Sequence, residues 1–225
     1  MPSFRQQVET HERWRRFLGI ERAPAGNDRA VLTFDDGPCP DGTSAVLDAL
    51  DAAGARATFF LLGEQLMSNV RLGRVIADRG HEIGLHGFAH DEHDGLSAAQ
   101  TRDDLARGLG TVEVATGVRP RWYRPPYGRL SEASAAACQA LSLTPVYWSA
   151  WGSDWEPIGP GRIAELVCRD LDDGAIVLLH DSARYAARES ALATAEAIAA
   201  IAAEARARGL ELTTLGEATA EAHDG

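Results

Sequence analysis

Short apolar runs, rich in β-branched and aromatic side chains, alternate along the chain with longer amphipathic stretches. Runs of this length predict buried β-strands, and the stretches between them predict helices. The expected strands cover residues 30–34, 57–62, 81–86, 121–125, 143–149, 175–180 and 210–215. The expected helices cover residues 43–53, 65–79, 97–116, 131–141, 161–171 and 186–208. Ser97 and Ser131 stand where side chains cap helix N-termini, and Gly209 follows a basic last turn as a C-cap.

This alternation of strands and helices predicts parallel βα units and an α/β fold. An open doubly wound sheet usually carries a glycine-rich phosphate loop after its first strand, but "DDGP" follows the first strand here. The other arrangement is a barrel of about seven parallel strands. We expect an amphipathic N-terminal extension over residues 1–27, one catalytic domain over 28–217 and a short tail over 218–225.

Reactive side chains fall at the ends of the predicted strands, as they do in barrel enzymes, where chemistry is placed at the C-terminal strand ends. The first strand runs directly into two adjacent carboxylates, and two later strands end in histidine. The residues concerned are Asp35, Asp36, His86, Arg124, Asp154 and His180.

Two histidines four residues apart, His86 and His90, suggest a metal site. On a helical turn this spacing places both rings on one side, and Asp36 can add a carboxylate to give the three-ligand set of many catalytic zinc sites. Such a histidine pair alone is weak evidence, but the nearby Asp–Asp pair strengthens it. The neighbouring "HDEHD", which includes His93, is interpreted as a solvated loop.

Two further stretches can build a pocket. In "WYRPPYG" the prolines stiffen the backbone, so Arg124 can be held against a carboxylate and the Tyr127 N–H can face an oxyanion; the alternative is a plain proline-rich turn. In "WSAWGSDW" the small and polar residues predict a loop, so Trp151 and Trp155 are expected to wall a pocket rather than fill a core.

The composition of the chain excludes several kinds of function. The net charge of −11 gives no general attraction to nucleic acid or anionic membranes, and the chain has no lysine, which excludes Schiff-base chemistry. The three cysteines have no zinc-site or disulfide pattern. Because the first residues lack the apolar core of a signal peptide, and no apolar run is long enough to span a membrane, we expect a cytoplasmic protein.

Five motifs, in order, resemble those of the polysaccharide deacetylases, the fourth family of carbohydrate esterases, which share the nodulation-deacetylase homology domain. They are "TFDDGP" (33–38), "HGFAH" (86–90), "RPPYG" (124–128), "WGSDW" (151–155) and "LLHD" (178–181). The resemblance implies a distorted (β/α) barrel.

The resemblance also implies roles for single residues. Asp36, His86 and His90 bind a divalent metal, Zn²⁺ in the first place, with Co²⁺, Ni²⁺ or Mn²⁺ as alternatives. Asp35 is the catalytic base held by Arg124, and His180 is the catalytic acid oriented by Asp154. Trp155 and Leu178 resemble the pocket for the acetyl methyl group. Gly87 departs from the family, which usually has Ser or Thr there; that hydroxyl braces the histidine loop.

The expected activity is metal-dependent hydrolysis of an N-acetyl group on an amino sugar or chito-oligosaccharide-like substrate, with release of acetate. Alternatives are a deacetylase of a small acetylated amine and a metal-binding module without turnover. Neither nucleic acid nor a membrane is expected as a partner, and the sequence does not indicate an oligomeric state.

Overall fold

The computed structural model describes residues 19–220, whose strands form one parallel sheet. The strands are β1 (Arg29–Asp35), β2 (Ala57–Leu62), β3 (Glu82–Gly87), β4 (Trp122–Tyr123), β5 (Thr144–Pro145), β6 (Ala150–Trp151), β7 (Ile176–His180) and β8 (Glu211–Thr213). Their order is β5-β4-β3-β2-β1-β7-β6, and β8 pairs with the start of β1. The predicted α/β fold with a parallel barrel is therefore confirmed.

One chain segment brings the two edges of the sheet together. Of the expected strand 143–149 only Thr144–Pro145 forms a strand, β5, which pairs with β4, while β6 follows at Ala150–Trp151 and pairs with β7. Ile20 forms a parallel bridge with Val146 between them. The barrel is distorted because this segment makes only short pairings on each side.

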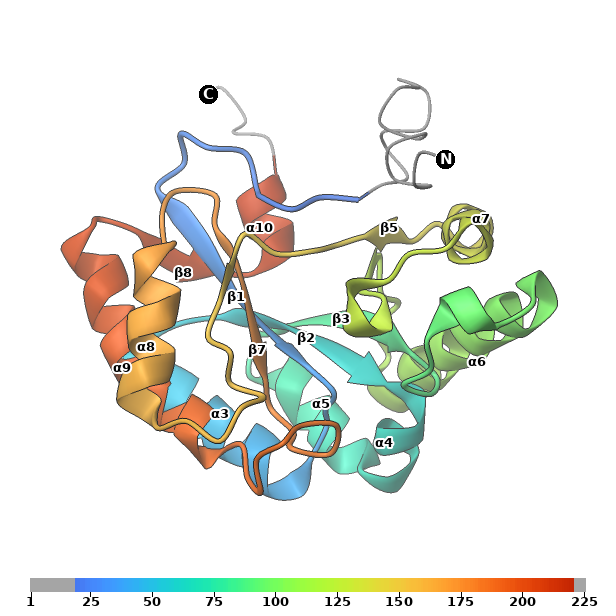
Figure 1. Cartoon of the computed structure of the whole chain (residues 1–225), viewed down its shortest axis with the longest axis horizontal. Coiled ribbons are helices and arrows are strands. Elements are labelled where there is room, and N and C mark those ends of the chain that lie inside the picture. The colour runs from blue at the N-terminus through green and yellow to red at the C-terminus, as the bar shows by residue number, and fades with distance from the viewer. Residues whose placement is uncertain (1–18, 221–225) are drawn as a thin grey trace.

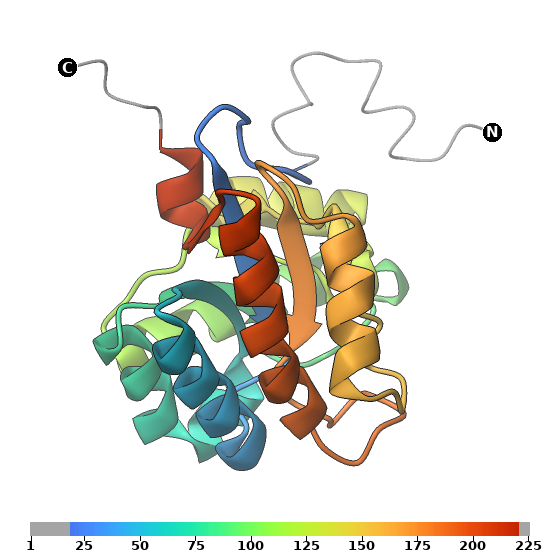
Figure 2. The same ribbon diagram turned by 90° about the vertical axis from the view of Figure 1, so that its left-hand side faces the viewer.

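Helices cover the outside of the sheet (Figure 1). They are α3 (Pro40–Ala53), α4 (Gly63–Ser68), α5 (Val70–Asp78), α6 (Ala98–Thr116), α7 (Glu132–Leu141), α8 (Pro160–Arg169), α9 (Leu192–Ala207) and α10 (Leu215–Thr219). Figure 2 shows α9 in front of the central strands, with α8 beside it, and α9 packs against both α3 and α8. In the described residues no helix is both long and apolar enough to cross a membrane.

The alternation of side chains along each strand creates two buried layers. On β1, Leu32 and Phe34 belong to the larger core under the outer helices. Val31 belongs to a smaller cluster inside the barrel, together with Phe60 and Ile176 of neighbouring strands. Since side chains two residues apart share a face, Asp35 also faces the interior of the barrel.

Local signals place most helix ends correctly. Ser97 and Ser131 cap α6 and α7 with capping boxes, and Gly209, just after α9, has a φ of +76°. The expected helix 65–79 is broken at Asn69, whose side chain donates to the carbonyls of Pro38 and Gln65. This side chain ties the break to the turn that carries the two aspartates.

The edges of the predicted domain differ in part from the structure. Residues 19–23, expected in an N-terminal extension, hydrogen-bond to the barrel, for example from Ala23 N–H to the Gly174 carbonyl. At the other end α10, which the sequence did not predict, includes residues expected in the tail. Residues 1–18, and with them most of the predicted amphipathic extension, lie outside the described residues, as do 221–225.

Candidate active site

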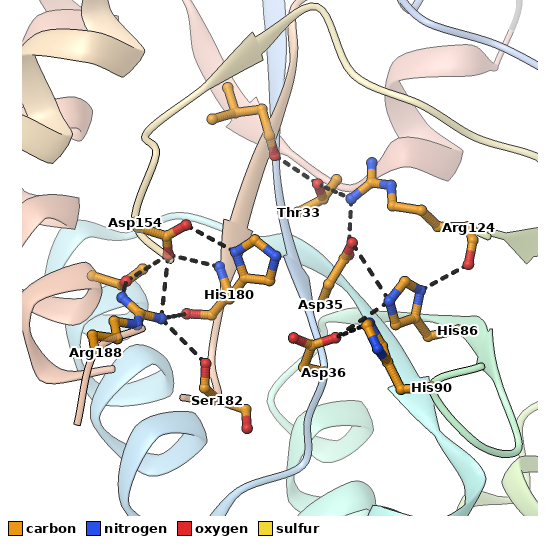
Figure 3. Close-up of polar contacts among 12 residues, drawn as sticks. Thr33, Asp35, Asp36, His86, His90, Arg124, Asp154, His180, Ser182 and Arg188 are labelled. Carbon is orange, nitrogen blue, oxygen red and sulfur yellow. Dashed lines mark hydrogen bonds and ion pairs between the residues drawn. The ribbon is translucent and has the colours of Figure 1, made fainter. Parts of the chain in front are cut away.

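The predicted strand-end residues meet at one end of the barrel (Figure 3). Asp35 is the last residue of β1, and Asp36 turns away from the strand with a φ of +76°, in the left-handed region that non-glycine residues seldom occupy. Both carboxylates are almost fully buried. Two buried like charges need nearby positive charge, and the two aspartates have different surroundings.

Arg124 is the partner of Asp35. Its Nη1 lies 2.9 Å from Asp35 Oδ1 and 2.6 Å from Thr33 Oγ1, and its Nη2 donates to the Tyr147 carbonyl at 2.8 Å. The guanidinium is fully buried, and because burial outweighs the Asp35 charge, the pKa of Arg124 lies below its ordinary value. These bonds hold the Asp35 carboxylate in one orientation.

Asp36 faces two imidazole rings instead. Its Oδ1 lies 3.3 Å from Nε2 of both His86 and His90, and the donor atoms of all three residues lie within 4.8 Å of one another. Asp36 Oδ1 is buried and has no hydrogen-bond partner. An unpaired buried oxygen beside two ring nitrogens fits a cation, and two imidazoles with one carboxylate suit a transition metal.

The protonation of His86 also suits a ligand. Its Nδ1 lies 2.7 Å from the Arg124 carbonyl oxygen, which can only accept, so Nδ1 carries the proton. Nε2 then presents a lone pair toward Asp36. A backbone carbonyl that fixes the tautomer in this way is a common support for metal-binding histidines.

His180 of β7 pairs with Asp154 of the loop after β6, and Asp154 is fully buried while His180 is 15% exposed. Asp154 Oδ1 lies 2.8 Å from His180 Nδ1, and Asp154 Oδ2 accepts from the His180 backbone N–H at 2.9 Å. Burial disfavours the charged ring, but the nearby carboxylates, Asp154 above all and then Asp36 and Asp35, together outweigh it and raise the pKa of His180 to about 9. His180 is therefore positively charged at neutral pH.

Two residues that the sequence did not indicate hold Asp154 in turn. Thr194 Oγ1 donates to Asp154 Oδ2 at 2.6 Å, and Arg188 Nη2 lies 3.4 Å from the same oxygen. Burial opposes ionisation of Asp154, but the charges of His180 and Arg188 hold its pKa below the ordinary value. Residues 186–191, expected within the last helix, form an irregular segment in which Arg188 is nearly buried.

A cavity of about 360 Å³ lies between the Asp35, Asp36, His86 and His90 side chains on one side and His180 on the other, and all five residues line it. Trp148, rather than the expected Trp151, lines it; Trp151 lies at the end of β6 and is 39% exposed. Tyr185, which no sequence signal indicated, also lines it and stacks on the His90 ring with centroids 4.1 Å apart. Among the predicted residues, its lining includes Asp35, Asp36, His86, His90, Tyr127, Trp155, Leu178 and His180.

The interpretation of His93 as part of a solvated loop was wrong. Its side chain has no exposed surface, and its two ring nitrogens contact Asp104 and Tyr123. The surrounding polar residues suggested exposure, but α6 and β4 cover this ring. Only contacts between distant elements reveal its burial.

Comparison with known proteins gives a consistent result. The family model for polysaccharide deacetylase matches residues 22–146. A peptidoglycan-N-acetylglucosamine deacetylase of Listeria monocytogenes is 34% identical over 69% of this chain, and a chitooligosaccharide deacetylase of a Bradyrhizobium strain is 34% identical over 70%. The match covers 33% of the Listeria protein and 72% of the Bradyrhizobium protein.

The solved structures include a relative without activity. A pseudoenzyme of carbohydrate esterase family 4 from Bacillus anthracis superposes with a TM-score of 0.81 and 25% identity, covering 90% of this chain and 69% of that one. The family model, the identities and the fold agree. The chain belongs to the polysaccharide deacetylase family.

Proposed function

We propose that the protein is a metal-dependent hydrolase that removes N-acetyl groups from amino sugars in a chito-oligosaccharide-like substrate and releases acetate. The observation that supports this most is the arrangement around one cavity of the Asp36–His86–His90 cluster, the Asp35–Arg124 pair and the Asp154–His180 pair. Amide hydrolysis needs the functions that such groups supply: electrophilic assistance, a base and an acid.

Asp36, His86 and His90 hold the cation in this proposal. When bound there, a divalent metal polarises the acetyl carbonyl and makes water more acidic. Asp35 accepts a proton from the attacking water, because Arg124 holds its carboxylate at the cavity while one oxygen stays free of that ion pair. Tyr127 lines the same cavity, and in this proposal its backbone N–H donates to the developing oxyanion.

His180 serves as the acid. An amine leaves as a neutral molecule only if its nitrogen gains a proton, and the raised pKa of His180 keeps a proton available at neutral pH. Asp154 orients the donating ring through Nδ1, which leaves Nε2 for the substrate. Trp155 and Leu178 form the apolar wall against which the acetyl methyl group packs.

Zn²⁺ is the metal we favour, because two imidazoles and a carboxylate form a typical catalytic zinc set. Co²⁺, Ni²⁺ and Mn²⁺ accept the same ligands and are the alternatives. Purified protein stripped with a chelator and reloaded with each ion separately identifies the metal. Activity restored by none of them would argue against a metal-dependent reaction.

An acetylated sugar is the favoured substrate, since the relatives above are named for peptidoglycan N-acetylglucosamine and chitooligosaccharides. The aromatic rings of Trp148, Tyr127 and Tyr185 at the cavity suit the apolar faces of a sugar. A small acetylated amine is the second candidate. Acetate release from chito-oligomers, peptidoglycan fragments and acetylated amines, compared at equal enzyme concentration, distinguishes them.

A metal-binding module without turnover is the alternative hypothesis, because a pseudoenzyme from Bacillus anthracis has the same fold. In this chain every proposed catalytic position carries a side chain capable of its role. Acetate release by the metal-loaded protein from any substrate of the panel supports the enzyme. Stoichiometric metal binding without acetate release would favour the module. Location in the cytoplasm stays a prediction.

A further inference from the structure

The two histidine ligands are supported very differently. His86 lies on β3, and its Nδ1 is fixed by the Arg124 carbonyl. His90 lies beyond the strand, and its Nδ1 is buried without a hydrogen-bond partner. Apart from the stacking of Tyr185 on its ring, its place therefore depends on the backbone of residues 87–90, which we call the ligand loop.

One carboxylate on α6 holds that loop. Asp104 Oδ2 accepts from the Phe88 N–H at 3.1 Å, and Asp104 Oδ1 accepts from the Ala89 N–H at 3.0 Å. The Asp104 side chain is only 11% exposed, so water competes little for these bonds. Hydrogen bonds to a charged acceptor in such a setting are stronger than those between neutral groups.

His93 and Tyr123 hold Asp104 in turn. Asp104 Oδ2 also lies 3.2 Å from His93 Nε2, and His93 Nδ1 lies 2.9 Å from the Tyr123 hydroxyl. The carboxylate can only accept, so His93 Nε2 carries a proton and Nδ1 accepts from Tyr123. Burial raises the pKa of Tyr123 well above its ordinary value, so its hydroxyl keeps the proton that it donates.

Gly87 leaves the space that Asp104 occupies. The glycine has a φ of +112°, and a Cβ there would lie 2.9 Å from both Asp104 Oδ2 and the Ala89 carbonyl oxygen. Gly108, one turn further along α6, likewise lets the helix lie directly on the loop, where a Cβ would meet Phe88 N at 2.8 Å. A residue with a side chain at position 87 conflicts with the carboxylate and with the backbone conformation.

We propose that Asp104, held by His93 and Tyr123, is a positioning residue that sets metal affinity by fixing the ligand loop. This inference rests on the proposed metal site. It also explains Gly87: the loop is held by Asp104 of α6, and the absence of a side chain at position 87 leaves room for the Asp104 carboxylate. The hydrogen bonds of the three bracing residues run to the ligand loop and to one another.

The first test compares metal affinity in two neighbouring variants. Asp104→Asn is expected to weaken Zn²⁺ binding, measured by chelator competition, by about 10- to 100-fold, the usual effect of removing a support outside the ligands. An amide cannot accept from both N–H groups and from His93 at once. Asp103→Asn, next to it on α6 with a side chain 79% exposed, is the matched control and keeps wild-type affinity.

The second test needs no metal. In the metal-free protein, hydrogen exchange of the Phe88 and Ala89 amides is expected to be about tenfold or more faster in Asp104→Asn than in wild type, because each bond is lost or weakened. A purely structural role elsewhere in α6 leaves these two amides unchanged. Equal exchange rates of these two amides in Asp104→Asn and wild type would show that Asp104 does not hold the ligand loop. This outcome does not depend on whether the loop binds metal.

Two more variants keep the outcome clear. Tyr123→Phe preserves the ring and its packing, so it tests the network if Asp104→Asn does not fold, and it is expected to weaken Zn²⁺ binding by a smaller factor. Gly87→Ser is expected to weaken Zn²⁺ binding too. If Gly87→Ser instead tightened it, or if Asp104→Asn and Tyr123→Phe both bound Zn²⁺ like wild type, the loop would not depend on Asp104. If the wild-type protein bound no metal, that result would contradict the proposed metal-dependent function, whereas the amide-exchange test of Asp104 would still stand on its own.

Discussion

Asp35 and His180 stand opposite each other on neighbouring parallel strands, paired in the register of β1 and β7. Side chains at paired positions point to the same face, so the proposed base and acid enter one cavity from adjacent strands. Each is bound to its own buried partner, Arg124 for Asp35 and Asp154 for His180. Each group is therefore held in place by its own partner, and both can act on one substrate.

Loss of a metal ligand should remove metal and activity together. Asp36→Ala, His86→Ala and His90→Ala are each expected to bind less than stoichiometric Zn²⁺, because three ligands leave little redundancy. Metal content per chain and acetate release are measured on the same samples. Asp41→Ala, which changes an exposed carboxylate, is the control. A His90→Ala protein with full metal content and activity would show that the ligand assignment is wrong.

Asp35→Asn should separate metal binding from turnover. The amide fills the same space but cannot take a proton from water, and general-base catalysis is typically worth about 10²–10⁴-fold. We expect a metal content like that of wild type and a fall in kcat within that range. Turnover close to wild type in the metal-loaded variant would exclude Asp35 as the base.

Arg124→Met should destabilise the fold. The change leaves the buried Asp35 carboxylate without its partner, and breaking a buried ion pair from one side typically costs about 3–5 kcal/mol. Denaturant unfolding measures the free energy of unfolding. Arg119→Met, which removes an exposed ion pair with Glu113, should cost about 1 kcal/mol or less. A cost for Arg124→Met as small as this control would mean that the pair contributes little to stability.

The pH profile should report His180. Its pKa is raised to about 9, and a cation beside Asp36 offsets part of the negative charge that raises it. We therefore expect activity to fall with rising pH between about 6.5, the ordinary histidine value, and 9. Asp154→Asn should move this alkaline limb to lower pH, because the stabilising carboxylate is lost. A limb that stays in place would mean that another group titrates there.

The same group should affect stability in a defined direction. The folded protein holds the His180 proton more tightly than the unfolded chain does. The contribution of protonated His180 to the free energy of unfolding is therefore complete below about pH 6.5. It is lost as the pH rises toward about 9. His180→Ala should flatten this part of the curve of unfolding free energy against pH.

Substrates with different leaving groups should test the acid directly. His180→Ala is expected to keep its metal but to lose most turnover on N-acetyl substrates. It should lose much less on activated aryl acetates, whose leaving group needs no proton. An equal loss on both would assign His180 to binding or structure instead.

The sequence alone determined the four central strands, most of the helices and the residues at the strand ends. These features are local: apolar runs predicted β1, β2, β3 and β7 to within a residue or so, and Ser97 and Ser131 cap helices through their own neighbours. In a parallel barrel the C-terminal strand ends share one rim, so residues far apart in sequence could be expected to meet.

Only the tertiary structure decided which polar residues are buried and what they contact. The sequence around His93 is typical of a solvated loop, but α6 and β4 cover its side chain. Trp148, and not Trp151, lines the cavity. Arg188 and Asp104 support the site from segments whose sequences carry no sign of it. Their roles depend on distances between elements that no local pattern encodes, because burial and hydrogen bonding across the chain are set only when the layers pack.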